Sequence, residues 1–503
     1  MKAYAIANAD FVVSRIDDRL YGAFLEHLGR AIYEGIYEPD HPTADANGMR
    51  GDVAELVRKL NCPVVRYPGG NFVSAYNWED GIGPREERPV RLDLAWHTAE
   101  SNAVGIHEFA DWCATVGTEM MLAVNLGSRG VDEARNFLEY CNHPGGTYWS
   151  DLRIRNGRAE PWNVKMWCLG NEMDGPWQVG HKNADEYGRL AANTARAMRM
   201  FDSSLELIVC GSSHSDMPTF PDWERIVLEH TYDHVDYVSL HMYFRNPESD
   251  TANYLALSEK LDRYIETVAS TIRQVKHKKR SKRDVRICFD EWNVWYHSMQ
   301  QDRAIREGRH GWPHAPALLE DIYNFEDVLM VGLVINTFIR RSDVVRIACI
   351  AQLVNVIAPI MTEKGGPAWA QTIYYPYYFA SVYGRGVALQ MPVRSPSYES
   401  AHAAETPYVD VAGVHDEDGG TLTFFIVNRN PDEAIDITID LQGFTGREII
   451  DHQVMTHPDL RAVNTAGKPM EVAPRKETGA RLGADGLSLP LPSYSYQMVR
   501  IAV

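Results

Sequence analysis

Eight short apolar runs, separated by stretches with helical spacing of hydrophobic residues, constrain the fold of this chain more than any other feature of its sequence. The runs are rich in Val, Ile, Leu and Cys, as expected of strands that are buried on both faces. They cover residues 19–25, 63–68, 119–125, 164–171, 206–212, 235–241, 285–291 and 344–352.

The stretches between these runs predict amphipathic helices. In residues 51–61, for example, Val53, Leu56, Val57 and Leu60 recur at helical spacing. The other predicted helices cover 104–117, 131–142, 184–202 (with Asn183 as its cap), 253–279 and 325–343. Strands that alternate with helices form parallel sheets, and eight units in succession favour a closed (β/α)₈ barrel. We predict this catalytic barrel over residues 16–384, with long loops.

After residue 384 the pattern changes to short strand-like runs separated by turn signals such as DEDGG and NRNPDE. These runs cover 421–430, 434–443, 447–455, 486–492 and 495–503, and no amphipathic helix lies among them. This pattern is typical of an antiparallel β-sandwich. Residues 2–16 also have strand character, so we expect them to pair with the C-terminal sheet. The second domain is therefore predicted to comprise residues 1–15 plus 385–503.

Composition excludes several classes of function. The chain carries 50 Lys and Arg against 68 Asp and Glu, a net charge of −18, which argues against nucleic-acid and anionic-membrane partners. The seven cysteines are odd in number and lack C-x-x-C spacing, so they are expected to be free thiols. No metal-binding motif or nucleotide fingerprint appears, and we expect no metal and no other cofactor. The chain shows no signal-peptide pattern and no long apolar run, which predicts a cytoplasmic location.

Polar side chains gather at the carboxyl ends of the predicted strands, where barrel enzymes have their active sites. Such groups are costly at the ends of apolar strands unless they are paired or used. The candidates are Glu26, Arg66, Asn71, Asn125, Asn171, Glu172, His241, Tyr243, Asp290, Glu291 and Gln352.

Two of these carboxylates suggest chemistry. Glu172 lies in WCLGNEMD and Glu291 in CFDEWNVWY. Two carboxylates in different environments can divide the acid and nucleophile roles at a glycosidic bond. A single glutamate at a strand end is more often a structural ion-pair partner, but the pair with its Asn, Trp and Tyr neighbours favours a glycosidase. Four tryptophans are either sugar-stacking platforms or core residues, namely Trp96, Trp177, Trp292 and Trp295.

Six segments, spread in order along the whole chain, resemble the α-L-arabinofuranosidases of glycoside hydrolase family 51. They are GAFLEHLGRAIYEGIYEP, VVRYPGGNF, LAWHTAESNAVGIHEF, WCLGNEMDGPWQ, SLHMY and FDEWNVWY. The resemblance implies a (β/α)₈ barrel with a jelly-roll-like β-sandwich, and a homohexamer built as a trimer of dimers. It implies that Glu172 is the general acid/base and Glu291 the nucleophile. The implied sugar-binding residues are Glu26, Arg66, Asn71, Asn171, His241, Tyr243 and Gln352, and we add Trp96 and Trp295 as candidates.

The expected function is that of a retaining, exo-acting α-L-arabinofuranosidase, which releases terminal arabinofuranose from arabinose-containing oligosaccharides through a covalent glycosyl-enzyme. Retention requires the two carboxylates to lie ~5–5.5 Å apart, with Glu172 protonated at rest. Arg66 is expected to keep Glu291 or Glu26 ionised. An endo-acting β-glucanase or xylanase with the same barrel is the alternative, and a non-catalytic sugar-binding protein is a third hypothesis. His27, Asp174 and Asp290 are expected to be structural, and loop 295–317 to influence specificity.

Overall fold

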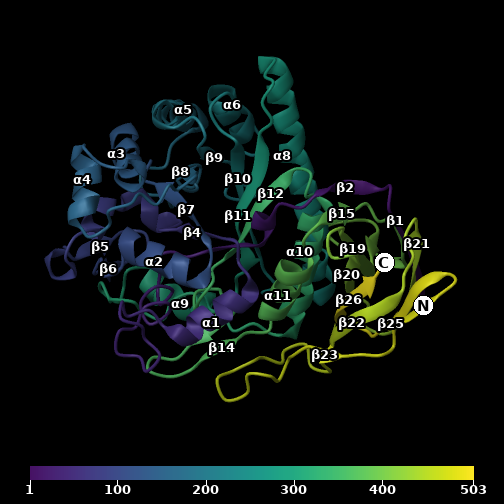
Figure 1. The fold of residues 1–503 in the computed structure, drawn as a ribbon. Coiled ribbons are helices and arrows are strands. Elements are labelled where there is room, and N and C mark those ends of the chain that lie inside the picture. The colour runs from purple at the N-terminus through teal and green to yellow at the C-terminus, as the bar shows by residue number, and fades with distance from the viewer.

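The computed structural model describes all 503 residues and contains the closed parallel barrel that the eight runs predict (Figure 1). Each run coincides with one barrel strand, although the sixth and seventh strands extend three residues beyond their runs, and the strands follow one another around the barrel in chain order. They are β3 (Gly22–Phe24), β4 (Val64–Tyr67), β7 (Glu119–Val124), β8 (Met166–Leu169), β9 (Glu206–Cys210), β10 (Tyr237–Phe244), β11 (Arg286–Val294) and β12 (Val345–Ala351). Pairing of Cys349 with Gly22, parallel like all the others, closes the barrel.

Every predicted helical stretch contains a helix, and further helices occur in the loops. The helices are α1 (Gly51–Leu60), α2 (Ile106–Val116), α3 (Val131–Asn142), α4 (Tyr148–Arg155), α5 (Ala184–Phe201), α6 (Asp222–Thr231), α7 (Thr251–Leu255), α8 (Leu257–Lys279), α9 (Met299–Arg306), α10 (Phe325–Arg340) and α11 (Tyr374–Tyr383). Asn183 caps α5 as predicted, because its side chain accepts a hydrogen bond from the Glu186 amide at 3.0 Å. No helix combines the length and apolarity needed to cross a membrane.

Two packed sheets form the second part of the molecule, where both termini lie (Figure 1). The smaller sheet has the order β16 (Val393–Arg394), β1 (Lys2–Asn8), β21 (Ile435–Gln442), β25 (Gly486–Leu491) and β24 (Arg481–Gly483). The larger has the order β2 (Val12–Arg15), β15 (Val387–Leu389), β19 (Val409–Asp416), β20 (Thr421–Asn428), β26 (Ser495–Ala502), β22 (Glu448–Met455) and β23 (Arg475–Lys476). Strand β1 pairs in parallel with β21, and every other pair in these two sheets is antiparallel.

The central strand β20 explains how the two parts fit together. All eight of its residues are buried, because both faces of the sheet are covered. Phe424 and its neighbours on one face pack against the smaller sheet, whereas Phe425 belongs to the core that includes α10 and α11. Figure 1 shows α10 and α11 between the barrel and the sheets. The limits of the two domains, 16–384 and 1–15 plus 385–503, stay a prediction.

A buried polar contact also joins the two parts. Asp410 of β19 accepts hydrogen bonds from Arg340 at 2.8 Å and from Asn336 at 2.7 Å, both on α10. Burial raises the pKa of Asp410, but the cationic Arg340 beside it outweighs burial and lowers that pKa below its usual value. All seven cysteines are buried free thiols, as predicted.

Candidate active site

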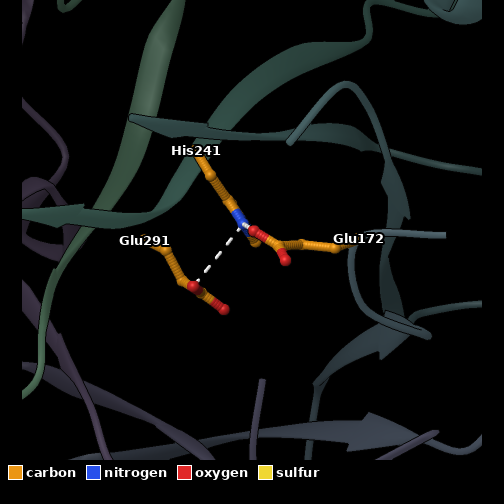
Figure 2. A group of neighbouring side chains, drawn as sticks. All are labelled: Glu172, His241 and Glu291. Carbon is orange, nitrogen blue, oxygen red and sulfur yellow. Dashed lines mark hydrogen bonds and ion pairs between the residues drawn. The ribbon is translucent and has the colours of Figure 1, made fainter. Parts of the chain in front are cut away.

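His241 lies between the two glutamates that the sequence singles out (Figure 2). Its Nδ1 is 2.9 Å from Oε1 of Glu172 and 3.6 Å from Oε2 of Glu291. One carboxylate oxygen of each glutamate and one His241 nitrogen lie within 4.8 Å of one another. Strands β8, β10 and β11 bring the three residues together at the carboxyl end of the barrel, although Glu172 and Glu291 are 119 positions apart in the sequence.

Glu291 is held by two further donors. Arg66 of β4 donates to its Oε1 at 2.6 Å, and the Tyr243 hydroxyl donates to its Oε2 at 2.8 Å. Burial raises the pKa of Glu291, whereas the positive charges of His241 and Arg66 oppose this effect. Arg66 was expected to keep Glu291 or Glu26 ionised; it contacts Glu291, where its charge only partly offsets the effect of burial.

A third carboxylate, Asp290, contacts Arg66 and His241. It forms ion pairs with Arg66 Nε at 3.0 Å and with His241 Nε2 at 3.3 Å, and it accepts a hydrogen bond from Ser239. Burial raises the pKa of Asp290, but Arg66 and His241 lower it below its usual value. Three carboxylates surround His241, and they raise its pKa to about 10 although burial acts in the opposite direction. These carboxylates therefore favour the protonated, cationic form of His241 between the two glutamates.

Glu172 follows the end of β8 in an unusual backbone conformation. Its φ angle of 43° lies in the left-handed region, which costs energy for a residue with a side chain. The carboxylate accepts a hydrogen bond from Trp177 Nε1 at 2.6 Å at its second oxygen. Trp177 was expected either to stack on sugar or to belong to the core. It is 46% exposed, which excludes the core, and it lines the cavity, where it also contacts the candidate acid/base directly.

The glycines of the PGGN segment allow the chain to approach Glu26 closely. A Cβ atom at Gly70 would lie only 2.4 Å from Glu26 Oε2. The Phe72 amide and Trp96 Nε1 donate to Glu26 Oε1 at 2.8 and 3.0 Å. Gln352 Oε1 accepts from the Glu26 amide at 2.9 Å. Burial, together with the nearby charge of Glu291, raises the pKa of Glu26 to about 8.

One cavity of about 700 Å³ brings these groups together. Eight of the predicted site residues line it, namely Glu26, Asn71, Trp96, Glu172, Tyr243, Glu291, Trp295 and Gln352. The other three, Arg66, Asn171 and His241, are buried behind the wall, where Asn171 accepts a hydrogen bond from Arg66 at 2.7 Å and donates to Asn71 at 3.3 Å.

Several residues that were considered lie outside the cavity. Trp292 is buried and packs against Phe338, so it is a core residue rather than a sugar platform. His27 bridges Glu100 and Tyr67, and Asp174 accepts hydrogen bonds from Ser213, which supports structural roles for both.

The sequence analysis missed part of the cavity wall. Ser213, His214, Ser215 and Asp216 line it. They directly follow the fifth apolar run, 206–212, so the polar residues after that run were an available signal. Arg245, Lys260 and Arg306 also line it, but they come from loops and helices in which the sequence offers no comparable signal.

The oxygens of Glu172 and Glu291 with the nitrogen of His241 are close enough to be considered as metal ligands. These carboxylate oxygens already have hydrogen-bond partners, however, because Trp177, Arg66 and Tyr243 donate to them. Two positive charges, on Arg66 and His241, also compensate the carboxylates. The arrangement suits acid/base and nucleophilic chemistry on a neutral substrate.

Two family models match this chain. The α-L-arabinofuranosidase 1 domain matches residues 56–266, and the α-L-arabinofuranosidase C-terminal domain matches residues 290–495. A solved family 51 α-L-arabinofuranosidase from Bifidobacterium longum is 44% identical, with a TM-score of 0.94 and 99% of each chain covered. The chain belongs to the family 51 α-L-arabinofuranosidases.

Two curated relatives of this family 51 α-L-arabinofuranosidase differ in the linkage that their names give. An intracellular exo-α-(1→5)-L-arabinofuranosidase from Halalkalibacterium halodurans is 54% identical over 100% of this chain and 99% of that protein. An exo-α-(1→6)-L-arabinofuranosidase from B. longum is 47% identical over 99% of this chain and 96% of that protein.

Proposed function

We propose that this family 51 enzyme is an exo-acting α-L-arabinofuranosidase that retains anomeric configuration, with Glu291 as nucleophile and Glu172 as general acid/base. The observation that carries the proposal is the approach of their carboxylate oxygens to within 4.8 Å. Retaining glycosidases have carboxyl groups ~5–5.5 Å apart, whereas inverting enzymes need ~6.5–9.5 Å to admit a water molecule between them.

In the first step, Glu291 attacks the anomeric carbon of the terminal arabinofuranose while Glu172 donates its proton to the departing glycosidic oxygen. The C–O bond to the leaving sugar breaks, and an ester between Glu291 and arabinose forms. In the second step, Glu172 takes a proton from water, which attacks the same carbon and releases arabinose and free Glu291.

The surrounding groups suit these steps. Arg66 and Tyr243 hold Glu291 in place and favour its charged form. The positive charge that develops on the sugar ring is stabilised by the buried carboxylate of Glu291. His241 contacts both catalytic carboxylates and is placed to orient them.

The substrates we propose are arabinose-containing oligosaccharides, in keeping with the exo-acting relatives. The (1→5) and (1→6) names of those relatives leave the linkage preference open. An intracellular location, by analogy with the relative that is named intracellular, would make imported oligosaccharides the natural substrates. Assembly as a homohexamer, a trimer of dimers, stays a prediction.

The test uses p-nitrophenyl α-L-arabinofuranoside with the wild type and Glu291→Ala. We expect turnover by the wild type and near-complete loss in the variant. Replacement of Glu172 by Ala should cost ~10²–10⁴-fold, with partial recovery by azide on this activated substrate. Glu133→Gln is the control, because Glu133 is a buried glutamate outside the cavity. Wild-type inactivity, or full activity of Glu291→Ala, would refute the proposal.

Two product analyses test the finer points. Nuclear magnetic resonance of the first-formed arabinose should show the α-anomer, and the β-anomer would exclude retention. Products from arabino-oligosaccharides should be free arabinose from the outset. Release of longer fragments from xylan or β-glucan without free pentose would instead support the endo-acting alternative.

A further inference from the structure

Two arginines form a cationic rim on the cavity that contains the catalytic glutamates. Arg245 follows β10 and Arg306 ends α9, and both side chains are exposed and line the cavity. Each guanidinium carbon lies 5.1 Å from the centre of the Trp295 ring. A cation at this distance over an indole face is attracted to it, so Trp295 holds both guanidinium groups in place.

Neither guanidinium forms a direct ion pair, in contrast to neighbouring cations. Trp295 contacts both guanidinium groups, and the carboxylates of Asp321 and Asp302 act on them only from beyond ion-pair distance. By comparison, Lys260 on the same cavity wall pairs with Asp216 at 2.5 Å. Arg303, one turn earlier on α9, pairs with Glu307 at 2.8 Å. Desolvation and the like charge of Arg306 lower the pKa of Arg245, and the more distant Asp321 only partly opposes them.

The two arginines are close to the reaction centre. The Tyr243 hydroxyl donates to Glu291, and the Tyr243 ring contacts Trp295 edge-on with 5.5 Å between ring centres. The acidic groups at the reaction centre are buried, whereas the arginines are exposed. A terminal arabinose bound against the buried glutamates would therefore extend its remaining sugars past the exposed rim.

We propose, on the basis of the proposed exo-acting function, that Arg245, Trp295 and Arg306 form a subsite for a carboxylate on the sugar that carries the arabinose, that is, a uronic acid. The planar guanidinium group matches a carboxylate with two parallel hydrogen bonds. Two such groups fixed on one ring are ready to bind an anion without further ordering of their side chains. The subsite adds a preference for acidic substrates to an enzyme whose own net charge is −18.

The experiment compares two substrates that differ in one charge. One is a disaccharide of α-L-arabinofuranose linked to a uronic acid, and the other is its methyl ester. We expect the wild type to have a kcat/KM about five-fold higher for the acid at low salt, the scale of exposed charge pairs. The ratio should fall toward one in Arg245→Gln/Arg306→Gln, and also for the wild type at about 0.5 M NaCl, where screening shortens the range of the interaction.

Arg303→Gln is the control for a general charge effect, because it removes one positive charge from the helix that carries Arg306, at a paired, exposed position outside the cavity. Its ratio should equal that of the wild type. Equal wild-type rates on acid and ester, or an equal loss in Arg303→Gln, would overturn the subsite. Activity on p-nitrophenyl α-L-arabinofuranoside separates this failure from failure of the proposed function, because that substrate carries no carboxylate.

Discussion

The hydrogen bond from Tyr243 to Glu291 gives a prediction about pH. Tyr243→Phe removes a 2.8 Å hydrogen bond to a buried carboxylate and changes no other group in contact with it. This donor favours the charged form of Glu291, so its loss raises the pKa of Glu291 further. Because only the charged form attacks, the acidic side of the activity profile should move to higher pH.

The magnitude follows from the energy of the bond. A hydrogen bond to a charged group contributes about 1.5–3 kcal/mol, which corresponds to a factor of about 10–150 in an equilibrium constant. Where activity is proportional to the charged fraction of Glu291, kcat/KM should fall by this factor. At higher pH, where Glu291 is charged in both proteins, kcat/KM of the variant should approach that of the wild type. Arg66 and His241 remain in the variant and still favour the charged form.

The assay is kcat/KM for p-nitrophenyl α-L-arabinofuranoside as a function of pH, which reports ionisations of the free enzyme. The matched control is Tyr254→Phe, since the Tyr254 hydroxyl donates to buried Asp327 at 2.9 Å outside the cavity. In Tyr254→Phe, the acidic side of the pH–activity profile should stay where it is in the wild type. A Tyr243→Phe profile that is lowered equally at all pH values, or moved to lower pH, would refute this reasoning.

Three further predictions concern single positions. Because the pKa of Glu26 is raised to about 8, the folded protein binds that proton more tightly than the unfolded chain, and stability falls as pH rises from about 4.5 to 8. The stability of Glu26→Gln relative to the wild type should therefore increase as pH rises, which urea unfolding at pH 5 and 9 would measure, and the variant should lose activity. The same difference in unfolding free energy between variant and wild type at both pH values would contradict this. Gly70→Ala should lower kcat/KM, because its Cβ would lie 2.4 Å from Glu26 Oε2, whereas Gly467→Ala, with no atom within 4 Å, should not. Asp410→Ala leaves Arg340 unpaired at the contact between barrel and sheets and should cost about 3 kcal/mol of unfolding free energy without a change in KM, and unchanged stability would disprove that role.

The barrel could be predicted because its signal is local. Strands buried on both faces must be apolar throughout, and the intervening helices must carry one apolar face, so the alternation is visible without knowledge of contacts. The helices in the long loops, α4 and α9 for example, escaped prediction because no comparable alternation with buried strands marks them. The strand character of residues 2–16 was visible, but its parallel pairing with β21 depends on a partner more than 430 residues away.

The proposed catalytic pair followed from position at the strand ends and from resemblance to family 51. The role of Trp177 did not, because an exposed tryptophan near a glutamate has the same local pattern whether it stacks on a sugar or donates to the carboxylate. Trp292 shows the converse, since it is only three positions before Trp295 in the chain yet lies in the core.

The sequence by itself determined the barrel, the order of its strands and the two glutamates at their ends, because chain order alone places these residues on one rim of a parallel barrel. Only the tertiary structure decided the charges and distances there. It places His241 between three carboxylates, Arg66 against Glu291 and two unpaired arginines over Trp295. These contacts join residues from different strands and loops, and ionisation depends on the burial and neighbours that such contacts create.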